Sequence, residues 1–478
     1  MKNILAFDVG TTAMKCILFD ESFKEISSVS MEYAIETSSD GIAELDAEKY
    51  YESFCECVNK MKHYSIDAIC FTTQGETFIP IDTDGKAISK AIVWLDTRAE
   101  EEALFIRENL SIEKIYSVTG LCDIDGALPL AKILWLRKNK PDIYEKTDKF
   151  LLLEDYLIFR LTGKKVSEKS LQSSTGWYDI ANEKFFDEAL ALCGIDRNKL
   201  PEILSCGSIV GKVSENLVLS PDTIVVTGAM DQISSAIGAG NICEGIVTET
   251  TGTALVVGAT VEKPEFDLNT PVTVYKHYDE KFIYMPYSAT AGIVLKWFRD
   301  TVMPQVIRDA EKKGVSSYKL IDEIAEKSPA GSNGVIMNPD FTNGGGFYNL
   351  TLATTQSDLA RSVLEGVSYM LRDLLEPIEK CGTAVDKILS LGGGSYSRLW
   401  GEIKASVCGK EIECVKYGET TALGAAILAA VAIGAYKSVE DTIGNIKNSG
   451  NKYKPGSEKK AVYEKCYLKY KEYIKNGG

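Results

Sequence analysis

The sequence contains the same strand–turn–strand pattern twice, once in each half of the chain. Residues 3–8 are typical of a buried strand, Gly10, Thr11 and Thr12 of a turn, and residues 14–19 of a second strand. Residues 246–260 repeat this order around a turn at Gly252 and Thr253. Because Gly-Thr turns are common between strands, the repeat gains weight only when residues suited to chemistry accompany it.

The segments that follow the first hairpin alternate between helix and strand. A third strand is expected at 25–33, an amphipathic helix at 47–61 and a buried strand at 66–72. This order predicts an α/β domain with a mixed sheet. A stretch with two glycines at 238–242 is a candidate hinge, so we expect two domains, 1–242 and 243–478. Further helices are expected at 359–381, 421–435 and 458–475.

Composition limits the partners of this 478-residue chain. Its formal net charge of −15 disfavours nucleic acid and anionic membrane surfaces. An anionic ligand therefore needs a local site built from backbone N–H groups, a few cations and a metal ion. No run of about eighteen apolar residues appears, and an acidic residue follows too soon after Met1 for a secretion signal. We expect a cytoplasmic protein.

Cysteine and histidine usage excludes several classes of enzyme. The 12 cysteines form no C-x-x-C pair, which indicates reduced thiols and not a zinc site or a disulfide framework. The sequence has 2 histidines, His63 and His277, and neither lies in a catalytic motif. A Ser-His-Asp hydrolase, a multi-histidine metal site and an H-R-D protein kinase are therefore excluded.

The first candidate for chemistry is the segment from Asp8 to Lys15. A carboxylate at the end of a strand, followed by a tight turn that offers N–H groups and hydroxyls, suits a magnesium-bound polyphosphate. Asp8 is placed to hold the hydrated metal, and Lys15 to meet phosphate oxygens. The alternative is an ordinary hairpin turn with an aspartate that caps it.

The second candidate is Asp231, which follows a buried strand and a glycine. A carboxylate in this position can accept the proton of a hydroxyl group, as phosphoryl transfer requires. The alternative is helix capping, because a helical pattern begins at Gln232. A third candidate, Gly392 to Ser395, follows a strand, and its glycines let a flat base approach the backbone. No Walker A loop is present.

Taken together, these segments resemble the FGGY family of carbohydrate kinases, which belong to the actin-like ATPase superfamily. The resemblance covers nearly the whole chain, and the order of the motifs carries it. The matching segments are Asp8 to Lys15, Trp94 to Arg98, Pro129 to Trp135, Asp155 to Gly163, Asp231 and Gln232, Gly252 and Thr253, Asp358 to Gly366, Gly392 to Gly394, and Ala422 to Ala426.

The resemblance implies two ribonuclease-H-like domains with a deep cleft between them for ATP, Mg²⁺ and a sugar. By position, Asp231 is implied as the general base and Asp8 as the carboxylate associated with Mg²⁺. The residues implied to bind the nucleotide are Asp8, Thr11, Thr12, Lys15, Thr251, Gly252, Thr253, Gly393, Gly394 and Ser395. The residues implied to contact the sugar are Gln74, Glu76, Trp94, Asp96, Asp231 and Gln232.

Two positions bear on the choice of sugar. Glycerol kinases resemble this chain around Gln74, but they carry an arginine where Gly75 stands and a tyrosine where Ala127 stands. The missing side chains disfavour glycerol and leave room for a longer ketose, so we expect a pentulose such as xylulose. Xylulokinases commonly have a histidine near Gln74, which this chain lacks. Asp96 and Arg98 have an alternative role as an internal ion pair.

Two other readings stay open. One is a glycerol or other polyol kinase, and the other is an actin-like ATPase without a sugar acceptor. A non-catalytic sugar-responsive protein on the same fold is disfavoured by the presence of Asp231. Asn349, where the family usually has glycine, and the short segment 340–344 depart from the family pattern. Neither the oligomeric state nor regulation can be deduced, and a homodimer is left open.

Overall fold

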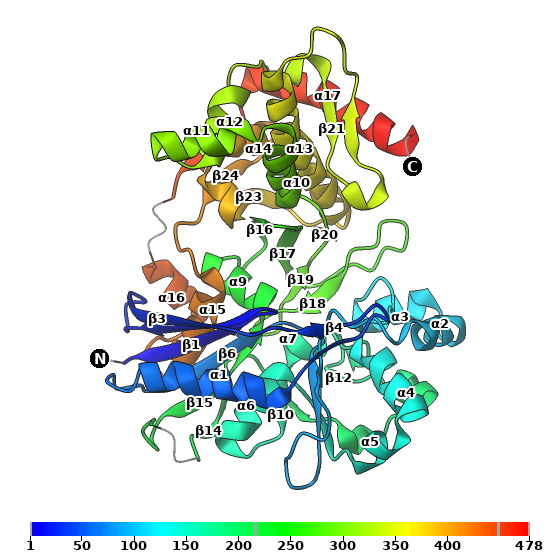
Figure 1. Ribbon diagram of the computed structural model, residues 1–478. Coiled ribbons are helices and arrows are strands. Elements are labelled where there is room, and N and C mark those ends of the chain that lie inside the picture. The colour runs from blue at the N-terminus through cyan, green and yellow to red at the C-terminus, as the bar shows by residue number, and fades with distance from the viewer. Residues whose placement is uncertain (1, 215–217, 447–449, 477–478) are drawn as a thin grey trace. The chain divides into compact units, whose positions relative to one another are not determined.

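The computed structural model describes residues 2–214, 218–446 and 450–476 (Figure 1). The chain forms two compact units. The first contains 1–242, 262–283 and 419–447, and the second contains 243–261, 284–418 and 448–478. The predicted domains, 1–242 and 243–478, are contiguous in sequence, whereas these units are interleaved. The segments 262–283 and 419–447 group with the first unit.

The strands of the first unit are β1 (Ile4–Val9), β2 (Ala13–Phe19), β3 (Glu25–Glu32), β4 (Glu36–Thr37), β5 (Ala43–Leu45), β6 (Ala68–Thr73), β7 (Phe78–Ile81), β8 (Ala91–Ile92), β9 (Lys149–Leu152), β10 (Val166–Glu168), β11 (Tyr178–Asp179), β12 (Lys184–Phe185), β13 (Glu202–Leu204), β14 (Ile209–Lys212), β15 (Ile224–Met230) and β18 (Val274–Lys276). Its helices are α1 (Ala47–Lys60), α2 (Glu100–Asn109), α3 (Ile112–Thr119), α4 (Pro129–Asn139), α5 (Pro141–Lys146), α6 (Leu153–Thr162), α7 (Lys169–Gln172), α8 (Asp187–Cys193), α9 (Asp231–Ala239), α15 (Thr420–Ala432) and α16 (Val439–Asn445).

The central sheet of the first unit has the order β14-β15-β6-β1-β2-β3. β1 pairs in antiparallel fashion with β2 and in parallel with β6, and β6 pairs in parallel with β15. The hairpin and the following strands therefore lie where the sequence predicts them. A second sheet, β4-β5-β8-β7-β9, carries the segments around Glu76 and Trp94.

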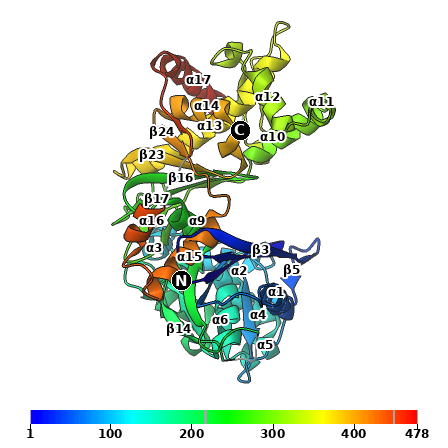
Figure 2. The same ribbon diagram turned by 90° about the vertical axis from the view of Figure 1, so that its left-hand side faces the viewer.

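Alternate side chains of β1 point to opposite faces of the central sheet. Leu5, Phe7 and Val9 belong to a core that includes residues of α1 and α6, and these two helices lie on the opposite side of the sheet from α15 (Figures 1 and 2). Asp8 shares the other face, on which α9 and α15 pack.

Glycines allow α9 and α15 to approach closely. A Cβ at Gly238 would lie 2.0 Å from the carbonyl oxygen of Thr420, and a Cβ at Gly424 would lie 1.9 Å from that of Ser234. Neither distance is tolerable for a larger residue. The close packing fixes the start of α9, and therefore Asp231, against the sheet.

The strands of the second unit are β16 (Gly245–Thr251), β17 (Leu255–Val261), β20 (Tyr287–Ser288), β21 (Ile336–Asn338), β22 (Gly346–Tyr348), β23 (Val385–Leu391), β24 (Glu411–Cys414) and β25 (Lys452–Tyr453), and β19 (Phe282–Tyr284) lies at its boundary. Its helices are α10 (Gly292–Trp297), α11 (Gln305–Lys313), α12 (Ser317–Ala325), α13 (Gln356–Lys380), α14 (Arg398–Cys408) and α17 (Ser457–Asn476).

The sheet of the second unit repeats the plan of the first. β16 pairs in antiparallel fashion with β17 and in parallel with β23, and β23 pairs in parallel with β24. In each unit, therefore, a hairpin strand lies beside two parallel strands that come later in the chain. The two Gly-Thr turns of the sequence occupy the same place in the two sheets.

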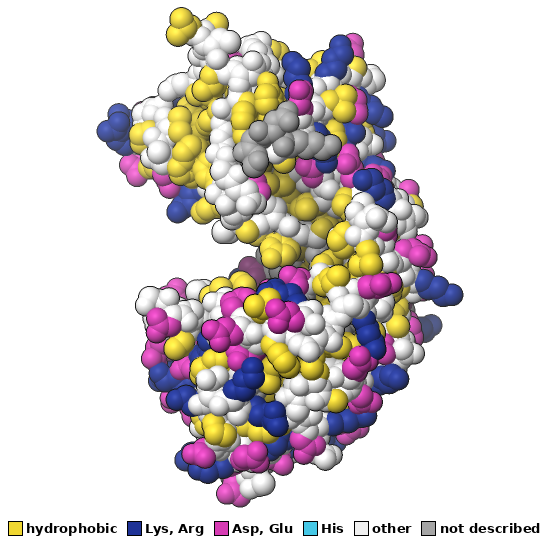
Figure 3. Space-filling model, turned by 90° about the vertical axis from the view of Figure 1, so that its right-hand side faces the viewer, with side chains coloured by type: hydrophobic (Ala, Val, Ile, Leu, Met, Phe, Trp, Pro, Cys, Tyr) yellow, Lys and Arg dark blue, Asp and Glu magenta, His cyan; other side chains and the backbone are white. Residues whose placement is uncertain are grey.

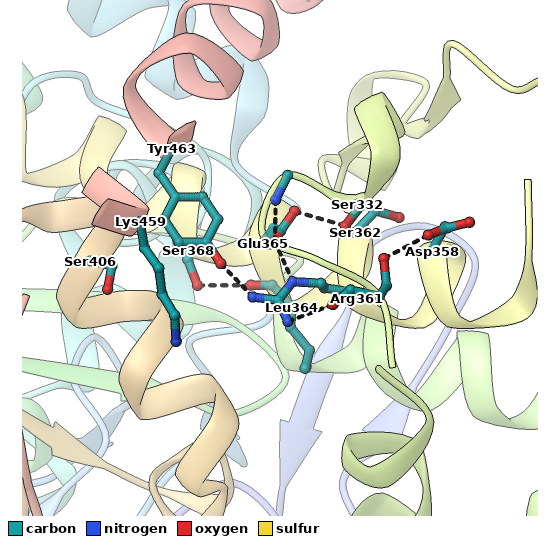
Figure 4. A network of polar contacts seen from close by, with 12 residues as sticks. Ser332, Asp358, Arg361, Ser362, Leu364, Glu365, Ser368, Ser406, Lys459 and Tyr463 are labelled. Atoms are coloured by element: carbon teal, nitrogen blue, oxygen red, sulfur yellow. Dashed lines mark hydrogen bonds and ion pairs between the residues drawn. The ribbon is translucent and has the colours of Figure 1, made fainter. Parts of the chain in front are cut away.

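A buried polar network holds α13 of the second unit in place (Figure 4). Arg361 donates to Glu365 at 2.7 Å and to the hydroxyl of Tyr463 at 2.7 Å. Glu365 also accepts the backbone N–H of Gly331 and the hydroxyl of Ser332. These contacts tie α13 to α17 and to the loop before β21, so the segment from Asp358 to Gly366 has a structural role.

Charges of both signs are interspersed on the face shown in Figure 3. Within the described part of the chain, no helix combines the length and the apolar character that a membrane crossing demands.

Candidate active site

Asp8 ends the first strand on the face that α9 and α15 cover. In the sheet register it lies opposite Lys15 on β2 and beside Thr72 on β6. Burial and the nearby carboxylates of Asp231 and Glu419 raise the pKa of Asp8 to about 7, although Lys15 opposes the shift. Lys15 itself forms an ion pair with Glu419. The carboxyl groups of Asp8, Asp231 and Glu419 therefore lie close together, and a bound cation would reduce their mutual repulsion.

The turn after β1 is connected by hydrogen bonds to the segment predicted to contact the sugar. The hydroxyl of Thr11 donates to Oε1 of Gln74 at 2.9 Å and accepts from the indole Nε1 of Trp94 at 2.9 Å. Gln74 is buried and also donates to Thr77. Trp94 keeps 38% of its surface exposed. Thr12 is exposed and open to a ligand.

Asp231 is the first residue of α9 and not its N-cap. The N-cap is Met230, and the Asp231 carboxylate accepts the adjacent Gln232 N–H at 2.6 Å, one of the free N–H groups of the first helical turn. Asp231 is therefore not the N-cap that the alternative interpretation predicts. Burial, with a further contribution from Glu76, raises the pKa of Asp231 to about 7. A carboxylate with this pKa can accept a proton near neutral pH.

A bulge in β15 precedes Asp231. The pairing of β15 with β6 shifts between Val226 and Ala229, and a Cβ at Gly228 would lie 1.7 Å from the carbonyl oxygen of Phe71. Only glycine fits there. The bulge directs the end of the strand so that α9 begins at Asp231.

Buried acids behind this bulge were not foreseen in the sequence. Glu154, fully buried, accepts the Gly228 N–H at 2.7 Å, and Ser170, which donates to Glu168, accepts the Met230 N–H at 2.9 Å. Burial and the neighbouring Glu168 raise the pKa of Glu154 well above its usual range. These side chains fix the backbone that leads to Asp231. No periodicity in the sequence marks them.

Glu76 adopts a left-handed backbone conformation with φ of 55°. For a residue other than glycine, this conformation is uncommon and is often found at functional sites. Burial raises the pKa of Glu76 to about 7, while Lys132 and Ser174 favour its charged form. Lys132 is fully buried and donates to the carbonyl oxygen of Val93 at 2.9 Å.

Asp96 is fully buried, and both of its carboxylate oxygens have partners. Arg98 donates to Oδ1 at 2.8 Å and to Oδ2 at 2.6 Å, and the Ala43 N–H donates to Oδ2 at 2.7 Å. Arg98 also bonds Glu44. This geometry favours the alternative role as an internal ion pair, and it leaves Asp96 as an indirect support for Trp94.

The second unit contains a cavity of about 760 Å³. Of the residues implied to bind nucleotide, those that line it are Thr251, Gly252, Thr253, Gly393 and Gly394. Gly292 lets the β16–β17 turn pack against α10, because a Cβ there would lie 2.1 Å from the carbonyl oxygen of Gly252. Ser395 is buried, and its hydroxyl donates to the carbonyl oxygen of Gly392 at 2.7 Å.

The opposite wall of this cavity was not predicted from the sequence. It comes from α12 and the start of α14 and contains Tyr318, Lys319, Asp322, Glu323, Glu326 and Arg398. Burial raises the pKa of Asp322 to about 6, although its hydrogen bond to Ser397 opposes the shift. Acceptors of this kind suit the hydroxyl and amino donors of a nucleoside.

The donor set fits Mg²⁺ bound mainly through phosphate. Within residues 2–214, 218–446 and 450–476, no group of three or more His, Cys, Asp or Glu side chains forms a metal cage. Mg²⁺ usually keeps several waters and takes only one or two carboxylates besides the phosphates of its substrate. Asp8, with its carboxylate neighbours, meets that requirement.

Comparison with known proteins decides the family. Residues 3–238 match the N-terminal domain of the FGGY family of carbohydrate kinases, and residues 247–433 match its C-terminal domain. The chain belongs to the FGGY family. The expectation of two actin-like α/β domains is thereby confirmed, and a carbohydrate kinase is the enzyme class.

Similar FGGY proteins differ in their substrates. The chain is 27% identical to a gluconokinase of Bacillus licheniformis, over 97% of this chain and 93% of the relative. It is also 27% identical to a xylulose kinase of Staphylococcus xylosus, over 90% and 91%. The ligand-bound xylulose kinase structure from Lactobacillus acidophilus superposes with a TM-score of 0.91 at 25% identity, over 100% and 98%.

Proposed function

We propose that this FGGY kinase transfers the γ-phosphoryl group of Mg-ATP to a hydroxyl of a neutral ketose, with a pentulose such as xylulose as the leading candidate. The observation that supports this most is Asp231. It begins α9 after a constrained bulge, it is not the N-cap of that helix, and its pKa is raised to about 7.

In the proposed reaction, Asp231 accepts the proton of the sugar hydroxyl as its oxygen attacks the γ-phosphorus. The bond between that phosphorus and the β–γ bridging oxygen breaks, and the products are the sugar phosphate and ADP. Asp8 and Lys15 are proposed to face the metal and the phosphates, with Thr11 and Thr12 in the same turn. Mg²⁺, when bound, neutralises charge on the phosphate oxygens.

In the second unit, Thr251, Gly252, Thr253, Gly393 and Gly394 are proposed to hold the nucleotide. Their common location on one cavity supports this assignment. Ser395 is proposed only as support for the glycine loop, because its hydroxyl already bonds Gly392.

The charge of the sugar site favours a neutral acceptor over an aldonate such as gluconate. Three cations of the site already have partners: Lys15 pairs with Glu419, Arg98 with Asp96, and Lys132 donates to Val93 O beside Glu76. Asp231 and Glu76 add two carboxyl groups to the site, and Asp125 lies near enough to Glu76 to raise its pKa further. A bound carboxylate would be repelled by these groups, whereas hydroxyl groups can donate to them.

Glycerol is disfavoured by the surroundings of Gly75. This residue is buried, and a Cβ there would lie 3.1 Å from both the Met230 Sδ and the Ser174 Oγ. An arginine at this position, as in glycerol kinases, would need these neighbours to move. Part of the space that the missing side chain leaves is therefore filled by Met230 and Ser174.

A coupled assay of ADP release tests the proposal with D-xylulose, L-xylulose, D-ribulose, erythritol, glycerol and D-gluconate. We expect turnover of at least one pentulose and much lower kcat/KM for glycerol and gluconate. Turnover of glycerol alone overturns the substrate argument, and a preference for gluconate overturns the charge argument.

The variant Asp231→Ala tests the general base in the same assay. We expect kcat to fall by about 10²-fold or more, since a positioned base contributes about 10²–10⁴. Sugar binding measured by calorimetry should change much less. Equal losses in turnover and binding contradict the assignment.

A further inference from the structure

A fully buried ion pair lies beneath the nucleotide cavity of the second unit. Nζ of Lys404 on α14 is 2.6 Å from Oε1 of Glu249 on β16. The two side chains are 1% and 0% exposed. Burying two charges costs several kcal/mol per ion unless good geometry and further hydrogen bonds compensate. A pair of this kind adds little net stability, but it holds its two side chains and their hydrogen-bond partners in a defined orientation.

Thr251 connects the two charges. Its hydroxyl donates to Oε2 of Glu249 at 2.6 Å and accepts from Nζ of Lys404 at 2.9 Å. Ser390 on β23 donates to Glu249 as well, and the ammonium of Lys404 lies 4.8 Å from the ring centroid of Trp400. Because Thr251 has one charged partner on each side, its side chain is held in a single orientation.

Thr251 is also the point where two walls of the cavity meet. It precedes Gly252 in the β16–β17 turn, and a Cβ at Gly394 would lie 3.0 Å from the Thr251 Cβ. A Cβ at Gly392 would lie 3.1 Å from the Thr251 carbonyl oxygen. A small displacement of Thr251 therefore shifts the turn and the glycine loop relative to each other.

We propose that Glu249 and Lys404 are positioning residues for nucleotide binding. Through Thr251 they hold the turn 251–253 in register with Gly393 and Gly394, so that both walls are pre-organised for the same ligand. The inference rests on the proposed nucleotide site. Neither charge lines the cavity among its described residues, so both act through Thr251 and not by direct contact.

The test separates positioning from simple stabilisation. Lys404→Met leaves Glu249 buried without its partner and should lower both the Tm and the affinity for ADP. The double variant Glu249→Met, Lys404→Met removes both charges, and an apolar replacement of a buried pair is often neutral for stability. We expect its Tm to recover while its Kd for ADP, measured by calorimetry with Mg²⁺, stays about 10-fold or more above wild type.

Two further variants sharpen the test. Thr251→Val keeps the ion pair but removes the connecting hydroxyl, and it should weaken ADP binding to a similar degree. Lys387→Met is the matched control, because Lys387 pairs with Glu413 at 3.1 Å on the same sheet and does not line the cavity. It should leave the Kd for ADP unchanged.

The outcomes distinguish this inference from the proposed function. If the double variant recovers both Tm and wild-type ADP affinity, the pair is merely structural and the inference is wrong. If the wild-type chain binds D-xylulose but not ADP, the nucleotide site itself is wrong. The titration needs no turnover, so a wrong choice of sugar does not affect it.

Discussion

The indole N–H of Trp94 donates to the hydroxyl of Thr11 at 2.9 Å. Thr11 follows the first strand of the central sheet, whereas Trp94 comes after β8 of the neighbouring sheet. The bond therefore joins the turn proposed to face phosphate to a residue proposed to face the sugar. It connects two segments of the proposed site that are 83 residues apart in sequence.

Trp94→Phe keeps a large ring but removes this donor. Because one hydrogen bond contributes about 0.5–1.5 kcal/mol, we expect the KM for the sugar to rise roughly twofold to tenfold. Thr11→Val should do the same, and Thr11→Ser, which keeps the hydroxyl, should behave as wild type. Steady-state kinetics with the preferred sugar measures the effect. An unchanged KM in both Trp94→Phe and Thr11→Val contradicts the role of the bond.

The rate should depend on pH through Asp231. Only the deprotonated carboxylate accepts a proton, and its pKa is about 7, so kcat/KM should rise with pH up to about 7 and then level off. Glu76 has a similar pKa, and Glu76→Gln is therefore the control that must retain the rising limb. A profile that stays flat from about pH 5 to 8 contradicts the base assignment.

Asp96→Asn should destabilise the first unit. It removes the more deeply buried of the two carboxylates that pair with the guanidinium of Arg98, and breaking a buried pair costs about 3–5 kcal/mol. We expect a fall in Tm of roughly 6–20 °C by calorimetry. The KM for the sugar should change by less than about threefold. A large rise in KM with an unchanged Tm identifies Asp96 as a substrate contact instead.

Gly393→Ala should impair nucleotide binding without affecting the fold. A Cβ at Gly393 meets no atom within 4 Å, yet the residue lines the cavity. We expect an unchanged Tm and a KM for ATP raised by about 10-fold, because the methyl group occupies ligand space. Gly346→Ala, which is equally open but away from the cavity lining, is the control. Equal KM values for the two variants place the nucleotide elsewhere.

Glu154→Gln should change how stability depends on pH. The pKa of Glu154 is raised in the folded chain, so the folded chain holds a proton that the unfolded chain has released above about pH 4.3. The free energy of unfolding therefore falls as pH rises through this window. Glutamine is neutral, so the variant does not lose stability in this way. The Tm of the variant minus the Tm of wild type should therefore be larger at pH 8 than at pH 5. The exposed Glu52→Gln should show no such gain.

The sequence predicts the parts of this protein that depend on local pattern. The hairpin around Gly10, the strand before Asp231 and the Ala-rich helix near 421–435 lie where alternation and helical periodicity place them. Asp8 and Asp231 could be chosen because Asp8 lies at the end of a buried strand and Asp231 follows one. The structure brings them close enough for Asp231 to affect the pKa of Asp8.

Other features depend on side chains that meet only in the folded chain. Lys404 and Glu249 are 155 residues apart, and neither is unusual in its local sequence. The same is true of Glu154 on α6, which accepts the N–H of Gly228 on β15. For Asp96 the sequence left two roles open, and only the two bonds from Arg98 favour one of them.

The close contact of α9 and α15 has a consequence for the synthesis of the chain. The helix that covers the Asp8 face of the first sheet ends at Ala432, far beyond the strands that it covers. Until the ribosome has made residues 420–432, the sheet face that α15 covers in the folded chain lacks this helix. The first unit can therefore be completed only after residues 420–432 have been made, and truncation before this helix leaves that unit incomplete.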